Sequence, residues 1–201
     1  SYTKRKSYYG GLGGGRTPQD SALANNAFGN TKDLAWVSGV QYTQNLQNRD
    51  VLTLGVEYNL AATEDGIPGY ERLIDQEVSS LGGYSQYEWK PSEVFTALLG
   101  ARRDHVRVDG FYAVGGIERT ADIRQTVLSP RLTVSYKISE ALRLRGGYAR
   151  GFRAPQAFNE DLHIANVGGE PQFVILSEDL ETEYSNAYTA SLNFSRSKDL
   201  L

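Results

Sequence analysis

The 201-residue sequence contains no cysteine and no methionine, and it has no long hydrophobic run. Without cysteine, a disulfide framework and thiol chemistry are excluded. No run approaches the roughly 18 apolar residues that a membrane-spanning helix requires. The hydrophobic content of 40% and the mean hydropathy of -0.45 are also low for a helical membrane protein. A membrane-spanning β-barrel is not excluded, because barrel strands alternate apolar and polar residues and are polar on average.

The sequence also has no excess of basic charge. The formal net charge is -3 at pH 7, and Lys4-Arg5-Lys6 is a short basic run in an otherwise mixed sequence. A nucleic acid is therefore not an expected partner, because phosphate binding needs clustered cations. The chain opens on Ser1 and has no signal-like apolar stretch. We therefore expect a segment of a longer protein whose processing signals lie elsewhere.

Alternation of apolar and polar residues with a period of two is the dominant pattern. In Val51–Leu60, Leu, Val and Tyr occupy every second position from Leu52 onward, while Val51 and then Thr, Gly, Glu and Asn fill the positions between them. One face of this strand is thus aliphatic and the other is polar. The same pattern predicts further strands at 36–42, 82–90, 95–104, 131–137, 142–151 and 184–194, and a weaker one at 2–9.

The predicted connections alternate between long and short. The long ones are 10–33, 61–81, 105–126 and 152–183, and the short ones are 43–50, 90–93 and 138–141. Outer-membrane barrels combine short periplasmic turns with longer extracellular loops, so this alternation favours them over a soluble sandwich. The predicted fold is all-β, an antiparallel transmembrane β-barrel segment with long extracellular loops and short periplasmic turns. Residues 1–201 would form a partial barrel of about eight strands.

A sequence motif adds a family resemblance to this pattern. Gly151-Phe152-Arg153-Ala154-Pro155 resembles the element that closes one barrel strand in TonB-dependent receptors, and the segment 177–183, with Asp179, Leu180 and Glu183, resembles the element that opens the next strand. Ser177 and Glu178 depart from the Asn and Pro usual there. Further similar segments occur in the family's order at 84–91, 100–104 and 129–132.

The resemblance implies a 22-stranded barrel with an N-terminal plug domain, located in the cell outer membrane. Such receptors import scarce ligands such as iron-siderophores or cobalamin, with energy from the TonB–ExbB–ExbD complex. Outer-membrane lipid, a small-molecule ligand and a surface lipoprotein are the other partners implied. The sequence shows no plug domain and too few strands for a complete barrel. The loop 158–164 resembles the cobalamin and siderophore receptors of Bacteroidetes, which makes Glu160, Asp161 and His163 candidate ligand contacts.

Other sequence features have simpler interpretations than a functional site. Gly10–Thr17 (GGLGGGRT) lacks the hydrophobic strand before it and the helix after it that a phosphate-binding loop needs, so it is predicted to be a flexible loop. The acidic residues at 178–183 do not have the spacing of an EF-hand, and the two histidines are far apart. No nucleophile motif is present. We therefore predict no metal, no cofactor and no enzymatic activity, and we expect Arg102, Arg131 and Arg153 to pair with acidic residues inside the barrel.

Two alternatives remain open at this point. One is a self-contained eight-stranded outer-membrane barrel with a structural or adhesive role. The other is a soluble β-rich binding domain, in which the polar faces of the strands would lie outside and the aliphatic faces inside. Alternation by itself does not separate these from the receptor segment.

Overall fold

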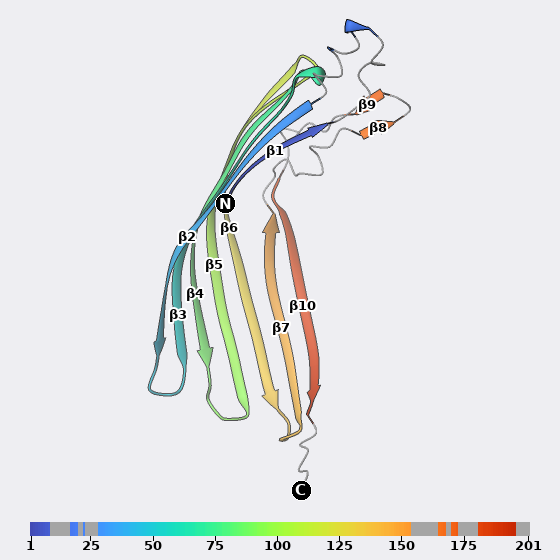
Figure 1. Cartoon of the computed structure of the whole chain (residues 1–201). Helices are drawn as coiled ribbons and strands as arrows, with labels where there is room; N and C mark the ends of the chain where they lie inside the picture. The colour runs from blue at the N-terminus through green and yellow to red at the C-terminus, as the bar shows by residue number, and fades with distance from the viewer. Residues whose placement is uncertain are drawn as a thin grey trace.

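The structure is a computed structural model that describes residues 1–8, 17–19, 22, 28–153, 165–167, 170–172 and 181–195. Eight strands form one antiparallel sheet in the order β1-β2-β3-β4-β5-β6-β7-β10 (Figure 1). They are β1 (Tyr2–Tyr8), β2 (Phe28–Asn45), β3 (Val51–Ile67), β4 (Arg72–Trp89), β5 (Phe95–Val114), β6 (Ile117–Lys137), β7 (Leu142–Arg153) and β10 (Glu183–Phe194). The short strands β8 (Ala165–Val167) and β9 (Glu170–Gln172) pair with each other.

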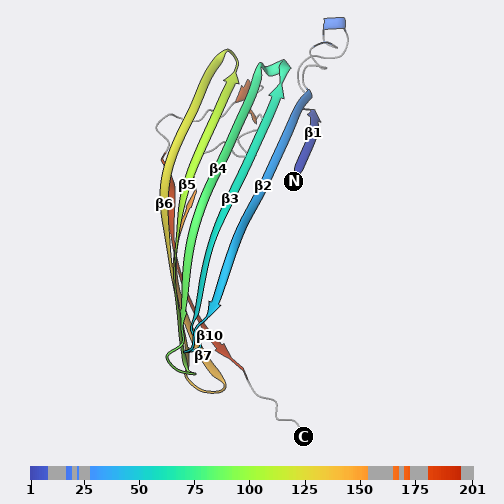
Figure 2. The same cartoon turned by 90° about the vertical axis from the view of Figure 1, so that its left-hand side faces the viewer.

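All eight predicted strands are present in this sheet, and each pairs with its neighbours in the chain. The all-β antiparallel prediction is therefore confirmed. β1 and β10 are the two edges of the sheet and do not pair with each other. The described strands thus form a curved wall (Figures 1 and 2) that is not closed on itself.

Two of the predicted long loops are wrong, because the strands continue through them. Within 61–81, β3 runs on to Ile67 and β4 begins at Arg72, with the one-turn 3-10 helix η1 (Pro68–Tyr70) between them. Glu71 closes this turn in the left-handed conformation, with φ of 48°. The predicted loop is therefore a β-hairpin that extends the wall.

The segment 105–126 is corrected in the same way. β5 continues to Val114 and β6 starts at Ile117, so only Gly115 and Gly116 lie between the strands. Their φ angles are 56° and 81°. Two consecutive residues with positive φ form the type I′ turn that matches the twist of a hairpin, and glycine adopts this conformation without steric cost. At about 3.4 Å per residue, the 21-residue β6 is roughly 70 Å long.

The apolar face of β5 changes sides along the strand. Near its beginning Leu99 and Ala101 lie on one face, whereas further up Val106 and Val108 lie on the opposite face and are buried. Arg103, His105, Arg107 and Asp109 then occupy the first face. The strand therefore keeps its period of two, but the side that avoids water is reversed.

A small buried core lies on this upper inner face. Ile74 of β4 lies directly opposite Tyr112 of β5, and Ala121 packs against them. The Tyr112 hydroxyl donates a 2.6 Å hydrogen bond to Gln76 Oε1, and burial raises the pKa of Tyr112 to about 12. The upper half of the wall is thus packed on its inner side.

Lower down, the apolar side chains are exposed on the outer face. Leu54, Val56, Leu132 and Leu192 are 43%, 55%, 39% and 61% exposed. They do not form a closed apolar interior, which is the arrangement that the soluble alternative requires. In β3, for example, every second residue from 52 to 60 is apolar. This stretch is close in length to the 9–11 residues that a tilted strand needs to cross a bilayer.

The apolar surface crosses the sheet obliquely. Leu60 of β3 lies opposite Ser79 of β4, which lies opposite Arg107 of β5. One row of side chains is therefore apolar on β3 and charged on β5. Strands that tilt relative to the membrane normal have this stagger, because a horizontal band must cut each successive strand at a different register position. We call this surface, formed by the outward side chains of residues 36–42, 52–60, 81–89, 95–101, 128–136, 142–148 and 188–194, the apolar band.

The short turns at the lower end are tied to one another. Asp50 precedes β3, and its carboxylate accepts hydrogen bonds from the Tyr87 hydroxyl (2.5 Å) and from the Lys90 backbone N–H (2.7 Å). These two hydrogen bonds, with the Tyr87 bond the larger effect, lower the pKa of Asp50. Arg49 Nη1 and Glu93 Oε1, 3.4 Å apart, add a second link between the same two turns.

Candidate functional site

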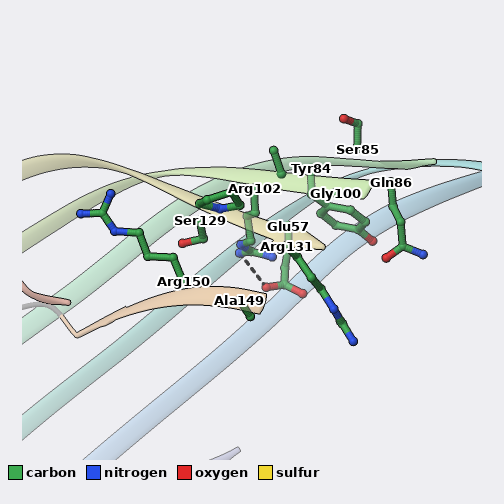
Figure 3. A pocket seen from close by; sticks show the side chains of 12 residues that line it. Glu57, Tyr84, Ser85, Gln86, Gly100, Arg102, Ser129, Arg131, Ala149 and Arg150 are labelled. Carbon is green, nitrogen blue, oxygen red and sulfur yellow. Dashed lines mark hydrogen bonds and ion pairs between the residues drawn. The ribbon is translucent and has the colours of Figure 1, made fainter. Parts of the chain in front are cut away.

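The polar inner face of the wall carries a charged network at its middle. Arg102 of β5 donates from Nη2 to Glu57 Oε1 of β3 (3.0 Å) and from Nε to Asp104 Oδ1 (2.9 Å), as Figure 3 shows for the Glu57 contact. Asn59 Nδ2 holds the same Glu57 oxygen at 2.9 Å. The Asp104 side chain is only 3% exposed, whereas those of Arg102 and Glu57 are 29% and 37% exposed. The network is therefore anchored in the wall at Asp104, and its partly exposed groups face inward, toward the lumen.

Two glycines make this network sterically feasible. In the sheet register, Gly82 of β4 lies directly between Glu57 and Asp104. A Cβ at Gly82 would lie 2.7 Å from Arg102 Cζ and closer still to Asp104 Oδ1. The guanidinium group therefore occupies the space that a side chain at position 82 would fill, which lets Arg102 reach across β4 to Glu57.

Gly55 does the same for an aromatic side chain. Gly55 lies opposite Tyr84, and a Cβ at position 55 would be 2.6 Å from Tyr84 Cε1. The tyrosine ring consequently leans over β3, and its hydroxyl donates a 2.8 Å hydrogen bond to Gln41 Oε1 of β2. Arg102 Cζ lies 5.9 Å from the centroid of this ring. Sequence reasoning did not identify Tyr84 or these two glycines; glycine inside an otherwise well-formed strand was the available signal.

A hollow of about 350 Å³ lies beside the network (Figure 3). Its lining includes Glu57, Tyr84, Arg102, Arg131 and Ala149. It lies where β6 and β7 separate, since their pairing ends at Arg131 opposite Ala149. The neighbouring residue in β6 is Pro130, which pairs with Ala101 of β5. Proline has no N–H, so Pro130 cannot donate the backbone hydrogen bond that would continue the pairing with β7.

Arg102 confirms the expectation of ion pairing, whereas Arg131 does not. In the part of the chain that the structure describes, Arg131 has no ion pair, and it lines the hollow as an exposed cation. The hollow therefore combines an aromatic ring, a paired arginine and an arginine without an acidic partner in that part. This composition suits a polar or anionic group, because arginine recognises carboxylate and phosphate-like oxygens.

The two motif segments meet in the sheet. Gly151, Phe152 and Arg153 are the last three residues of β7, and Glu183 is the first residue of β10. Arg153 lies directly opposite Glu183, and Phe152 lies opposite Tyr184. Ala154, Pro155, Asp179 and Leu180, and the loop candidates Glu160, Asp161 and His163, lie outside the described residues. Their predicted roles stay predictions.

The described residues contain neither a candidate metal centre nor a membrane-spanning helix. No group of three or more His, Cys, Asp or Glu side chains within those ranges is placed to hold a metal ion. No helix in the same ranges is long and apolar enough to cross a membrane.

The long antiparallel wall, with its exposed apolar band outside and its charged network inside, defines a segment of a transmembrane-type β-barrel. The chain belongs to the TonB-dependent receptor-like β-barrel family, which matches residues 1–201. The predicted resemblance to TonB-dependent receptors is therefore confirmed at the level of the family. No curated sequence matches the chain.

Among solved structures, the chain is similar to the ferric-catecholate import receptor Fiu from E. coli K12 in its closed form, with a TM-score of 0.57 and 11% identity. The similarity covers 97% of this chain and 34% of that receptor, so this chain spans about a third of its length. At this identity the likeness shows the fold alone.

Proposed function

We propose that the chain is part of the barrel wall of a TonB-dependent outer-membrane receptor that imports a scarce ligand such as an iron-siderophore or cobalamin. The observation that carries the proposal is the combination of family membership with a wall whose outer face is apolar and whose inner face is charged. In this orientation the short turns are periplasmic, and the extended hairpins β3–β4 and β5–β6 are extracellular. The role is transport rather than catalysis.

The two alternatives are less well supported. A self-contained eight-stranded barrel would pair its first strand with its last, but β1 and β10 are opposite edges of the sheet. A soluble domain would leave the apolar band in water, and contiguous apolar surfaces of that kind mark interaction with another phase or partner.

The ligand class and the partners follow from the receptor role. The similar receptor imports ferric catecholates, which makes a ferric catecholate the first ligand to test and cobalamin the second. Tyr84, Arg102 and Arg131 supply the inner-face groups that a ligand or a plug domain would contact. The TonB–ExbB–ExbD complex is the proposed energy source, and a surface lipoprotein is a further candidate partner.

The proposal is tested by deleting the gene of the full-length receptor. Deletion cells are grown with a ferric catecholate as the limiting iron source, and separately with cobalamin as the limiting nutrient. We expect loss of growth on one ligand, restoration by the intact gene, and no restoration in cells that also lack TonB. Unimpaired uptake of every ligand by the deletion cells would contradict the proposal.

A further inference from the structure

Three arginines lie on the outer face of the wall, directly beyond the apolar band. They are Arg103 and Arg107 of β5 and Arg124 of β6, which we call the cationic patch. Arg107 lies directly opposite Arg124, and Arg103 lies opposite Leu128, so all three side chains are on the face that carries the band. Leu128 is itself 55% exposed. The patch begins at the band's edge and extends about 14 Å along β5, at roughly 3.4 Å per residue.

The order of charges along both strands is the same. Arg107 is paired with Asp109 through Nε and Oδ2 (2.6 Å), and Arg124 with Asp122 through Nη2 and Oδ2 (3.1 Å). In each case the arginine is nearer the apolar band and the aspartate is one register row further from it. Asp109 and Asp122 lie opposite each other, and Glu77 of β4 lies in the same row. A group that approaches from the band therefore meets cations before it meets carboxylates.

Placing Arg107 directly opposite Arg124 is unfavourable by itself. Like charges in directly opposed cross-strand positions repel, and each is here offset by its own aspartate. A register that opposed each arginine to an aspartate would avoid this repulsion, but the sheet instead forms a cation row next to the band and an anion row beyond it. An anionic partner on the band side would relieve the repulsion between the two arginines.

Arg103 is the part of the patch that is available for a partner. It is exposed, and no acidic side chain in the described part of the chain pairs with it. Its neighbour across the strand pair is Gly83, and a Cβ placed there would have nothing within 4 Å. The absence of a side chain at position 83 leaves open space on the outer face next to the strand position of Arg103, at the boundary of the band.

We propose that the cationic patch binds the phosphate groups of membrane lipid in the outer leaflet, with Arg103 as the principal contact. Arginine forms paired hydrogen bonds with phosphate oxygens. Basic side chains at a membrane surface attract anionic lipid head groups. The apolar band fixes the depth of the lipid, since its acyl chains lie against Leu99 and Leu128 and its phosphate then lies level with Arg103. The inference depends on contact between this face and a bilayer, and it is independent of the ligand that the receptor imports.

The test uses the full-length receptor purified in detergent micelles. Binding of dioctanoyl phosphatidic acid is measured by native mass spectrometry, with dioctanoyl glycerol as the probe that lacks phosphate and inorganic phosphate as the probe that lacks acyl chains. The variants are Arg103→Gln and Arg103→Lys. The matched control is Arg119→Gln, because Arg119 is exposed on the other face of the same hairpin, opposite Tyr112. Heat-modifiable migration of each variant shows that it is folded.

We expect wild type to retain phosphatidic acid in preference to dioctanoyl glycerol and not to retain inorganic phosphate. Arg103→Gln should weaken the binding of phosphatidic acid about five-fold, the effect of one basic residue at an anionic membrane surface. Arg103→Lys should keep most of the binding, and Arg119→Gln should leave it unchanged. Equal binding of phosphatidic acid by wild type and Arg103→Gln, equal losses in Arg103→Gln and Arg119→Gln, or retention of inorganic phosphate alone would each overturn the inference.

Discussion

Replacing Gly82 with alanine tests whether the charged network on the inner face depends on the empty space at that position. The added Cβ would lie 2.7 Å from Arg102 Cζ, and Arg102 would have to move. Overpacking of this kind costs about 1–3 kcal/mol. Displacement of Arg102 also removes the cation beside Asp104, whose side chain is 3% exposed. Loss of one partner of a fully buried pair costs about 3–5 kcal/mol, but the Arg102 side chain is 29% exposed, so water offsets part of this loss. We expect a total near ~2–3 kcal/mol.

Gly83→Ala is the matched control, because it makes the same chemical change one residue away. Nothing lies within 4 Å of a Cβ at position 83. There the substitution should be neutral or should stabilise by about 0.5–1 kcal/mol, since alanine restricts the unfolded chain more than glycine does.

The measurement is hydrogen exchange, followed by mass spectrometry on peptides of β4 and β5 in the full-length receptor. A loss of about 2 kcal/mol corresponds to exchange roughly 30-fold faster, at about 1.4 kcal/mol per factor of ten. Combining Gly82→Ala with Arg102→Ala should reduce the effect of the glycine substitution, because the clashing group is gone. Equal exchange in Gly82→Ala and Gly83→Ala would refute the reasoning.

Three further predictions concern other parts of the wall. Val56→Arg, in the middle of the apolar band, should destabilise the barrel by about 2–4 kcal/mol, the cost of a cation that faces the bilayer midplane. The folded fraction of the variant in lipid vesicles measures this loss. An unchanged folded fraction would contradict a lipid-facing Val56. Asp50→Asn should make the stability of the receptor less sensitive to acid. Because folding lowers the pKa of Asp50, the carboxylate stabilises the folded state above the ordinary aspartate pKa of about 4. This stabilisation is lost as the pH falls through the pKa that Asp50 has in the folded state. Unfolding temperatures of wild type and variant should therefore converge at low pH, and parallel curves would count against the role of the turn. Asp65→Asn should destabilise the β3–β4 hairpin by about 3 kcal/mol, because the buried Asp65 Oδ2 lies 3.6 Å from the buried Arg72 Nη2. Limited proteolysis at residues 68–71 measures this loss, and an unchanged rate of cleavage would refute it.

The sequence predicted the lower half of the sheet because lipid and lumen impose opposite polarity on the two sides of each strand. It failed for the upper half because the polarity of the two faces is reversed there. After Ala101 the apolar positions shift to Val106 and Val108 on the other face. Neither face is therefore apolar along the whole strand, and the alternation on either face alone predicts too short a strand. The Gly115-Gly116 pair was a hairpin signal that could have corrected the error.

The candidate site was predictable only in part. A charged residue between apolar ones in a strand indicates an inward-facing polar group, which placed Arg102 correctly. Its partners depend on the register of three neighbouring strands, since Glu57, Gly82 and Asp104 share one row. That register is fixed by the turns and by the packing of the whole sheet, so single-strand patterns do not determine it.

The central claim is that the outward face of the wall contacts lipid acyl chains up to Ala101, and lipid head groups and water from Arg103 onward. The sequence has no cysteine, so a cysteine placed at each position from 97 to 109 can carry a single nitroxide label in this segment. Accessibility to oxygen, which concentrates in lipid, and to a water-soluble nickel complex is then measured in bilayers. We predict high oxygen accessibility at 99 and 101, and high nickel accessibility at 103, 105 and 107. Nickel accessibility at Leu99 equal to that at Arg107 would contradict the account.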